Sequence, residues 1–291
     1  MTISDVSKIT GMHWHTIKGI EKQYLFSKYK HIPMKDVRYI AIDEFAVQKG
    51  HKYMTVVMNW ESGQVLYVGL GRASEVLDNF FKKIKRWKSN INAVAMDMWP
   101  AYIKSVREHL PQAQIVYDWF HVVKMLNHGI DQLRRQLYAN ELSQQQRQVL
   151  KGSRWILLKR GYNLKTNQQE HQRLEEALRM NKPLATAYYL KEELTLLWHY
   201  DTKRKAMRFL EDWCQRARLS GVAILNKLAN TIARVKTGLL AWYDHPISTG
   251  PLEGLNNKIK VLKRRAYGYR DLEYFKLKIL DIHKTRYPLL R

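Results

Sequence analysis

The sequence predicts an α/β protein in which a mixed sheet with helices on its faces is interrupted by a large all-α insertion. Two observations predict this class. Over residues 37–117, short apolar runs bounded by turn residues alternate with stretches of helical periodicity, as in a sheet covered by helices. From residue 122 to about residue 244 strand signals stop and only helical patterns continue. A last basic helical segment follows from Leu252.

Five strands and two helices are predicted before the helical block. The strands are the compact apolar runs at residues 37–42, 52–59, 64–70, 91–96 and 114–117. Ser74 is predicted to cap a helix whose apolar side chains share one face, namely Leu77, Phe80, Phe81 and Ile84. Pro100 suits the first turn of the second helix. Three strands, helix, strand, helix, strand is an order that predicts a mixed sheet.

The first thirty residues predict two short helices. Ser4 can cap a helix that runs to Ile9, residues 10–12 break it, and residues 13–24 form the second helix. Two helices joined by a tight glycine turn have the outline of a helix-turn-helix. An ordinary helical hairpin has the same pattern, so both interpretations remain open.

The composition predicts a basic cytoplasmic protein that binds nucleic acid. The chain has 291 residues, 50 Lys and Arg against 26 Asp and Glu, and a net charge of +24. Such a surface attracts polyanions. The only cysteine, Cys214, excludes a disulfide framework and a cysteine-based zinc site. No run of 18 apolar residues predicts a membrane span, and the start of the chain does not have the pattern of a signal peptide.

Two carboxylates follow predicted strands. Asp43 and Asp97 each stand at the end of an apolar run, and ligand sites of α/β sheets gather at strand ends. Burying such an acid is costly unless it is paired or binds a metal. Each could instead cap a turn or a helix, above all Asp97, because a helix begins at Pro100. Two acids on separate strands of one sheet favour a metal site.

A third acid, Glu253, begins the predicted helix 252–265. It opens a polar stripe at helical spacing that continues through Asn257, Lys260 and Arg264. From Asn256 through Arg270 there are six basic residues and no acidic one. This pattern favours a metal ligand beside a phosphate-binding surface. The alternative is a glutamate favoured by the positive end of the helix dipole.

Four ordered motifs together resemble the ISL-three family of insertion-sequence transposases. They are Ala41-Ile42-Asp43-Glu44-Phe45, Asp97-Met98-Trp99-Pro100-Ala101-Tyr102, Asp118-Trp119-Phe120-His121-Val122-Val123-Lys124 and Leu252-Glu253-Gly254-Leu255-Asn256-Asn257-Lys258-Ile259-Lys260. The resemblance implies a DDE transposase with an RNase H-like core and a helical insertion. It divides the chain into a partial helix-turn-helix at 1–30, the first part of the core at 35–128, the insertion at 129–245 and the helical end of the core at 246–291.

The resemblance also implies a chemistry and a set of residues. Asp43, Asp97 and Glu253 would hold two Mg²⁺ or Mn²⁺ ions for DNA cleavage and strand transfer. The residues that would grip DNA are Lys258, Lys260, Lys263, Arg264 and Arg265. The implied partners are double-stranded DNA, as transposon ends and target, and a second copy of the chain, in the nucleoid of a bacterium.

Asp118 and His121 match a C/D-x-x-H signature of related transposases and form a secondary site. Asp118 also ends a predicted strand, which makes it the rival of Asp97 as second catalytic acid. A buried Asp–His hydrogen bond at a helix start is the structural alternative for this pair.

In one respect the sequence departs from the family pattern. Family members begin with a cysteine-rich zinc-binding segment and a complete helix-turn-helix, whereas this chain has Cys214 alone. We therefore expect a shortened N-terminus and DNA binding with little sequence preference. Two alternative functions follow: a catalytically impaired DNA-binding remnant, or an RNase H-like structure-selective nuclease.

Overall fold

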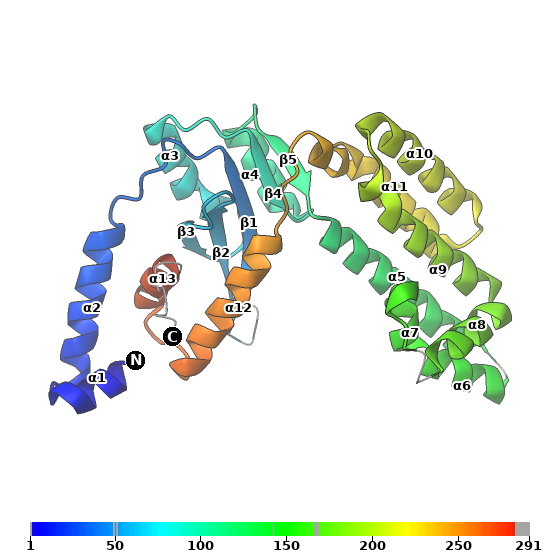
Figure 1. The fold of residues 1–291 in the computed structure, drawn as a ribbon, viewed down its shortest axis with the longest axis horizontal. Helices are drawn as coiled ribbons and strands as arrows, with labels where there is room; N and C mark the ends of the chain where they lie inside the picture. The colour runs from blue at the N-terminus through cyan, green and yellow to red at the C-terminus, as the bar shows by residue number, and fades with distance from the viewer. Residues whose placement is uncertain (1, 49, 51, 142, 166–168, 283–291) are drawn as a thin grey trace. The chain divides into compact units, whose positions relative to one another are not determined.

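The structure, a computed structural model, describes residues 2–48, 50, 52–141, 143–165 and 169–282 (Figure 1). The chain divides into two compact units. The sheet unit comprises the described residues within 1–117 and 245–291, and the helical unit is Asp118–Asp244. Within the described residues, no helix is both long enough and apolar enough to span a membrane.

The sheet unit contains one five-stranded mixed sheet in the order β3-β2-β1-β4-β5. Its strands are β1 (Tyr39–Gln48), β2 (Lys52–Asn59), β3 (Val65–Leu70), β4 (Ala93–Met96) and β5 (Gln114–Tyr117). β1 pairs antiparallel with β2, and β2 with β3, whereas β1–β4 and β4–β5 are parallel. All four residues of β4 are buried, as expected of a central strand covered on both faces. This confirms the predicted RNase H-like α/β class.

Helices cover both faces of this sheet. They are α3 (Asp78–Trp87) after the short 3₁₀ helix η1 (Ser74–Leu77), α4 (Pro100–His109), α12 (Gly250–Arg265) and α13 (Leu272–Leu280). The Tyr102 hydroxyl of α4 lies 2.8 Å from that of Thr55, which pairs with Glu44. Asn256 of α12 instead contacts Asp43, the preceding residue of β1. Because successive strand side chains point to opposite faces, α4 and α12 cover opposite faces.

The first strand is longer than the sequence predicts. We expected it at residues 37–42, but β1 continues to Gln48. Its parallel pairing with β4 stops at Ala41↔Ala95, whereas its antiparallel pairing with β2 continues through Asp43↔Val56. The β1–β2 hairpin therefore carries β1 beyond the end of β4, and Asp43 lies inside the strand, just past the parallel ladder.

The N-terminal helices are held to the sheet unit mainly by charge. α1 (Ile3–Thr10) and α2 (Trp14–Tyr29) are separated at Gly11, which has a φ of +69°. Thr2, not Ser4 as predicted, caps α1. α1 buries no residue and α2 buries only two. Four ion pairs join α2 to α13 and its two flanking residues: Lys18–Asp271 and Lys22–Asp271, both at 2.9 Å, and Lys28–Asp281 and Glu21–Lys278, both at 2.6 Å.

All of the regular structure that is described in the helical unit, residues 118–141, 143–165 and 169–244, is helical. Its α-helices are α5 (Trp119–Asn140), α6 (Gln144–Gly152), α7 (Arg154–Leu158), α8 (Glu170–Met180), α9 (Lys182–Leu194), α10 (Lys203–Leu219) and α11 (Ala223–Leu240). Short 3₁₀ helices are η2 (Gly161–Asn163), η4 (Thr195–His199) and η5 (Ala241–Tyr243). The unit begins at Asp118, whereas the sequence placed the boundary at residue 129. A boundary at 129 would divide the continuous helix α5, so residues 119–128 belong with the helices.

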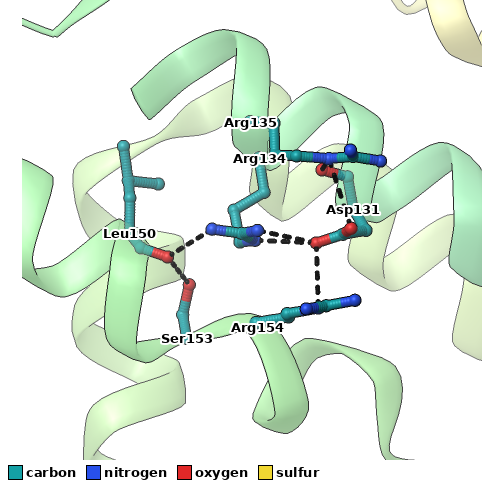
Figure 2. Close-up of polar contacts among 6 residues, drawn as sticks. All are labelled: Asp131, Arg134, Arg135, Leu150, Ser153 and Arg154. Atoms are coloured by element: carbon teal, nitrogen blue, oxygen red, sulfur yellow. Dashed lines mark hydrogen bonds and ion pairs between the residues drawn. The ribbon is translucent and has the colours of Figure 1, made fainter. Parts of the chain in front are cut away.

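A buried ionic cluster joins α5, α6 and α7 (Figure 2). Asp131 accepts a 2.8 Å hydrogen bond from Arg134 and forms wider ion pairs with Arg135 and Arg154. Arg134 also donates to the carbonyl of Leu150 at the C-terminal end of α6. Burial raises the pKa of Asp131, but Arg134, Arg154 and Arg135 outweigh it and hold this pKa below its usual value. We refer to these residues as the Asp131 cluster.

Candidate active site

Asp43 joins the first strand to the C-terminal helix α12. One carboxylate oxygen, Oδ1, accepts a 2.9 Å hydrogen bond from the backbone N–H of Glu44. The other, Oδ2, accepts a 2.8 Å bond from the side-chain amide of Asn256. Asn256 lies beside Leu255 and Ile259, which are buried and fix this face of α12 against the sheet unit. The first predicted carboxylate is therefore oriented by a residue 213 positions later in the chain.

Asp97 follows β4 directly and organises the turn that leads into α4. Its Oδ1 accepts a 2.9 Å hydrogen bond from the backbone N–H of Trp99. Trp99 is the residue before Pro100, where α4 begins. The turn-forming role and a place in a metal site coexist here, because a carboxylate has two oxygens and several lone pairs.

Glu44 lies within the electrostatic reach of both aspartates, and the sequence analysis assigned it no role. Burial and then the charges of Asp97 and Asp43 raise the pKa of Glu44 to about 7, although Arg72 and the Tyr102 hydroxyl act in the opposite direction. Its Oε2 is buried and has no hydrogen-bond partner among the described residues. The sequence signal that could have identified Glu44 is a second acid, directly after Asp43, inside an apolar strand.

Glu253 occupies the exposed first turn of α12, one turn before Asn256. The predicted polar stripe through Asn257, Lys260 and Arg264 is exposed as well. In the part of the chain that the structure describes, no three His, Cys, Asp or Glu side chains are grouped closely enough to hold a metal ion. Thus Asp43 lies in β1 and Asp97 directly follows the neighbouring strand β4, and Glu253 does not complete a metal-binding group with them among the described residues.

The donor set nevertheless suits a hard divalent cation. Asp43 and Asp97 supply only oxygen atoms, which are the ligands that Mg²⁺ and Mn²⁺ prefer. Their charges also raise the pKa of Glu44, whose side chain points to the opposite face of the sheet from Asp43. A cation held by the two aspartates would relieve this repulsion.

The structure places the secondary pair in the helical unit. Asp118 is 4% exposed and caps α5, with its Oδ1 3.0 Å from the backbone nitrogen of Phe120. His121 lies in the first turn of the same helix, and its Nδ1 is buried without a hydrogen-bond partner among the described residues. Capping explains Asp118 locally, so its role in chemistry stays a prediction.

The five predicted DNA-binding residues differ in their surroundings. Lys258, Lys260, Arg264 and Arg265 are exposed on α12. Lys263 is half-buried and donates a 2.7 Å hydrogen bond to the carbonyl of Val47 near the end of β1. Lys263 therefore fastens α12 to the sheet, a contact that the sequence pattern did not indicate.

A mixed sheet in this order, with acids on β1 and after β4, defines a chain of the RNase H-like class. The family model DDE_Tnp_ISL3, described as a transposase, matches residues 40–279. The chain belongs to this family, the ISL-three transposases. That assignment agrees with the resemblance carried by the four sequence motifs.

Curated relatives are themselves transposases of insertion sequences. The chain is 41% identical over 280 residues to the transposase for insertion sequence element IS1001 of Bordetella parapertussis, covering 95% of this chain and 68% of that protein. It is 26% identical to the transposase for IS1557 of Mycobacterium tuberculosis, covering 91% of this chain and 64% of that protein. The chain thus spans about two thirds of the length of these relatives.

One solved structure resembles the fold distantly. It is the Drosophila P element transposase strand transfer complex, with a TM-score of 0.43 and 11% sequence identity. The alignment covers 92% of this chain and 82% of the other.

Proposed function

We propose that this chain performs the DNA cleavage and strand transfer of an insertion sequence at the acids of β1, β4 and α12. Asp43 and Asp97 would hold divalent ions, with Glu253 as the third ligand. Bound Mg²⁺ or Mn²⁺, as a pair of ions, would activate the attacking oxygen and stabilise the leaving oxygen. The observation that carries the proposal is the hydrogen bond from Asn256 to Asp43, because it holds the helix of Glu253 against the strand of the first acid.

One set of residues orients the acids, and another set would contact DNA. The amide of Asn256 and the backbone N–H of Glu44 orient the Asp43 carboxylate, and the N–H of Trp99 orients Asp97. Exposed Lys258, Lys260, Arg264 and Arg265 would contact DNA phosphates, whereas Lys263 holds α12 in place. We extend the proposal to a homodimer that acts on double-stranded transposon ends and target DNA in the bacterial nucleoid.

Replacement of each acid by its amide tests the triad. Asp43→Asn, Asp97→Asn and Glu253→Gln should each abolish Mg²⁺-dependent cleavage of duplexes made from the DNA flanking the gene. DNA affinity should remain, because removing a negative charge does not weaken attraction to a polyanion. Glu273→Gln, on exposed α13 surface, is the matched control. Normal cleavage by Asp97→Asn together with loss of cleavage in Asp118→Asn would assign the second position to Asp118 instead.

Asn256 and its neighbour Asn257 form a second matched pair. Asn257 is exposed and does not contact Asp43 among the described contacts, so Asn257→Ala should behave as wild type. Asn256→Ala should raise the Mn²⁺ concentration needed for half-maximal cleavage, because the carboxylate loses its orientation. An unchanged metal requirement with a lowered melting temperature would reduce Asn256 to a packing residue.

His121→Ala tests the secondary pair. If His121 organises the reaction, cleavage should slow while the choice of metal stays the same. Loss of a cooperative melting transition in this variant would instead support the packing interpretation of Asp118 and His121.

A further inference from the structure

One arginine of the sheet unit lies against two aromatic rings. Arg72 follows β3, and the central carbon of its guanidinium lies 4.4 Å from the ring centre of Tyr53 and 4.8 Å from that of Trp99. The indole N–H of Trp99 donates a 3.1 Å hydrogen bond to the Arg72 carbonyl. The Gly71 N–H bonds the Tyr53 carbonyl at 2.8 Å. Three segments of the sheet unit therefore fix this side chain.

The edge of this guanidinium remains available for a ligand. Two rings contact the guanidinium, and its five N–H groups are the donors that a ligand could meet. Among the described residues, none accepts a hydrogen bond from the Arg72 side chain or forms an ion pair with it. By contrast, Arg160 of the helical unit also lies over two rings, of Trp119 and Tyr162, but donates a 2.8 Å hydrogen bond to the Tyr162 hydroxyl.

Arg72 lies close to the acids yet does not pair with them. Among the described residues, no ion pair joins Arg72 to an acid. Its ring partner Trp99 is the residue whose backbone N–H binds Asp97. A guanidinium is thus fixed against the residue that orients the Asp97 carboxylate.

We propose that Arg72 binds a non-bridging oxygen of the DNA phosphodiester presented to Asp97. A guanidinium presents a planar fork that matches two phosphate oxygens, and clamping by rings removes the side-chain freedom that binding would otherwise cost. Arg72 is then a substrate-binding residue on the Glu44 face of the sheet, whereas the α12 lysines bind the backbone elsewhere. The identity of the phosphodiester as transposon DNA rests on the proposed function.

A binding experiment tests the contact without requiring catalysis. The Nε–H signal of Arg72, assigned with Arg72→Lys, is followed by ¹⁵N NMR in the full chain without metal while the dinucleotide dTpdT is added. We expect a saturable shift for dTpdT and none for its neutral methylphosphonate analogue. The Arg160 Nε–H signal should stay in place. Equal shifts with both dinucleotides, or no shift with either, would overturn the proposal. Tighter binding of inorganic phosphate than of dTpdT would replace the DNA source by free phosphate.

A cleavage experiment separates this inference from the proposed function. Arg72→Ala should slow cleavage by about 10²–10³-fold, the usual loss when one preorganised donor to a reacting phosphate is removed. Arg72→Lys keeps the charge without the fork and should recover only part of the rate. Arg160→Ala, the ring-stacked control, should cleave as wild type. Inactive wild-type protein that still shows the NMR shift would refute the proposed function alone. Full activity of Arg72→Ala would refute this inference alone.

Discussion

The two units treat buried acid in opposite ways. In the helical unit, Asp131 is surrounded by three arginines, which lower its pKa (Figure 2). In the sheet unit, Glu44 has two aspartates for neighbours, and burial together with their charges raises its pKa to about 7. In the Asp131 cluster, arginines neutralise the negative charge, whereas the acids of the sheet unit carry excess negative charge. The Asp131 cluster is therefore suited to join helices, and the acids of the sheet unit are suited to bind a cation.

The largest expected effect is the loss of the neutralised acid. Asp131→Ala leaves Arg134 buried without its partner, which should lower the free energy of unfolding by about 3 kcal/mol. Urea denaturation measures this change. Asp212→Ala, which removes an exposed partner of Arg216, is the control and should cost well under half as much. Equal losses would show that the Asp131 cluster contributes no more than a surface ion pair.

In the sheet unit, we refer to Asp43, Glu44 and Asp97 as the acid-rich cluster. Removing the Glu44 charge there should raise the free energy of unfolding, not lower it. The folded-state pKa of Glu44, about 7, exceeds its usual value, so ionisation costs stability as the pH rises from about 4.5 through 7. Glu44→Gln should therefore stabilise the metal-free protein by about 1–3 kcal/mol at pH 8 and much less at pH 5. Thermal unfolding in EDTA at both values measures it. A variant that is less stable at pH 8 would contradict the charge account.

A divalent ion should stabilise the acid-rich cluster only. Mn²⁺ at ten times its dissociation constant should add about 1.4 kcal/mol to the free energy of unfolding. The melting temperature should rise in wild-type protein, and the rise should vanish in Asp43→Asn. Asp131→Asn should still show the rise in melting temperature, because Asp131 is paired with arginine and is not expected to bind the added ion. Equal stabilisation of all three proteins would indicate nonspecific binding.

The smallest effect concerns a neutralised acid at the surface. Asp271 is partly buried, which raises its pKa, but Lys22, Lys18 and the Tyr274 N–H outweigh burial and lower it. Its stabilising contribution is therefore present above about pH 4 and is lost as the pH falls further. We expect less than about 1 kcal/mol, seen as faster proteolysis of α1 and α2 at acidic pH. Asp271→Asn should be cleaved at neutral pH as fast as the wild-type protein is cleaved at acidic pH.

Local patterns in the sequence predicted most of the sheet unit, because strand and helix periodicity is a property of neighbouring residues. The runs at residues 52–59 and 114–117 are strands with those bounds. The end of β1 was wrong because it depends on pairing with β2, not on its own composition. The compact helical unit begins at Asp118, before the predicted boundary at residue 129, because α5 is one continuous helix across that position.

Contacts between distant segments explain what the sequence analysis missed at the site. Asn256 was part of a quoted motif, but its bond to Asp43 spans 213 residues and has no local signal. Arg72 has no local signal either, because its two rings come from β2 and from the turn after β4. Glu253 was recognised from its basic surroundings, and its role as a ligand stays a prediction.

The bond between Asn256 and Asp43 also sets an order of events during synthesis. A ribosome that adds about 5–20 residues per second needs about 10–40 s to proceed from Asp43 to Asn256. Throughout that interval the strand with the first acid exists without the helix that orients it. A nascent or prematurely terminated chain therefore carries an incomplete site, and a message broken before α12 yields a protein that cannot assemble it.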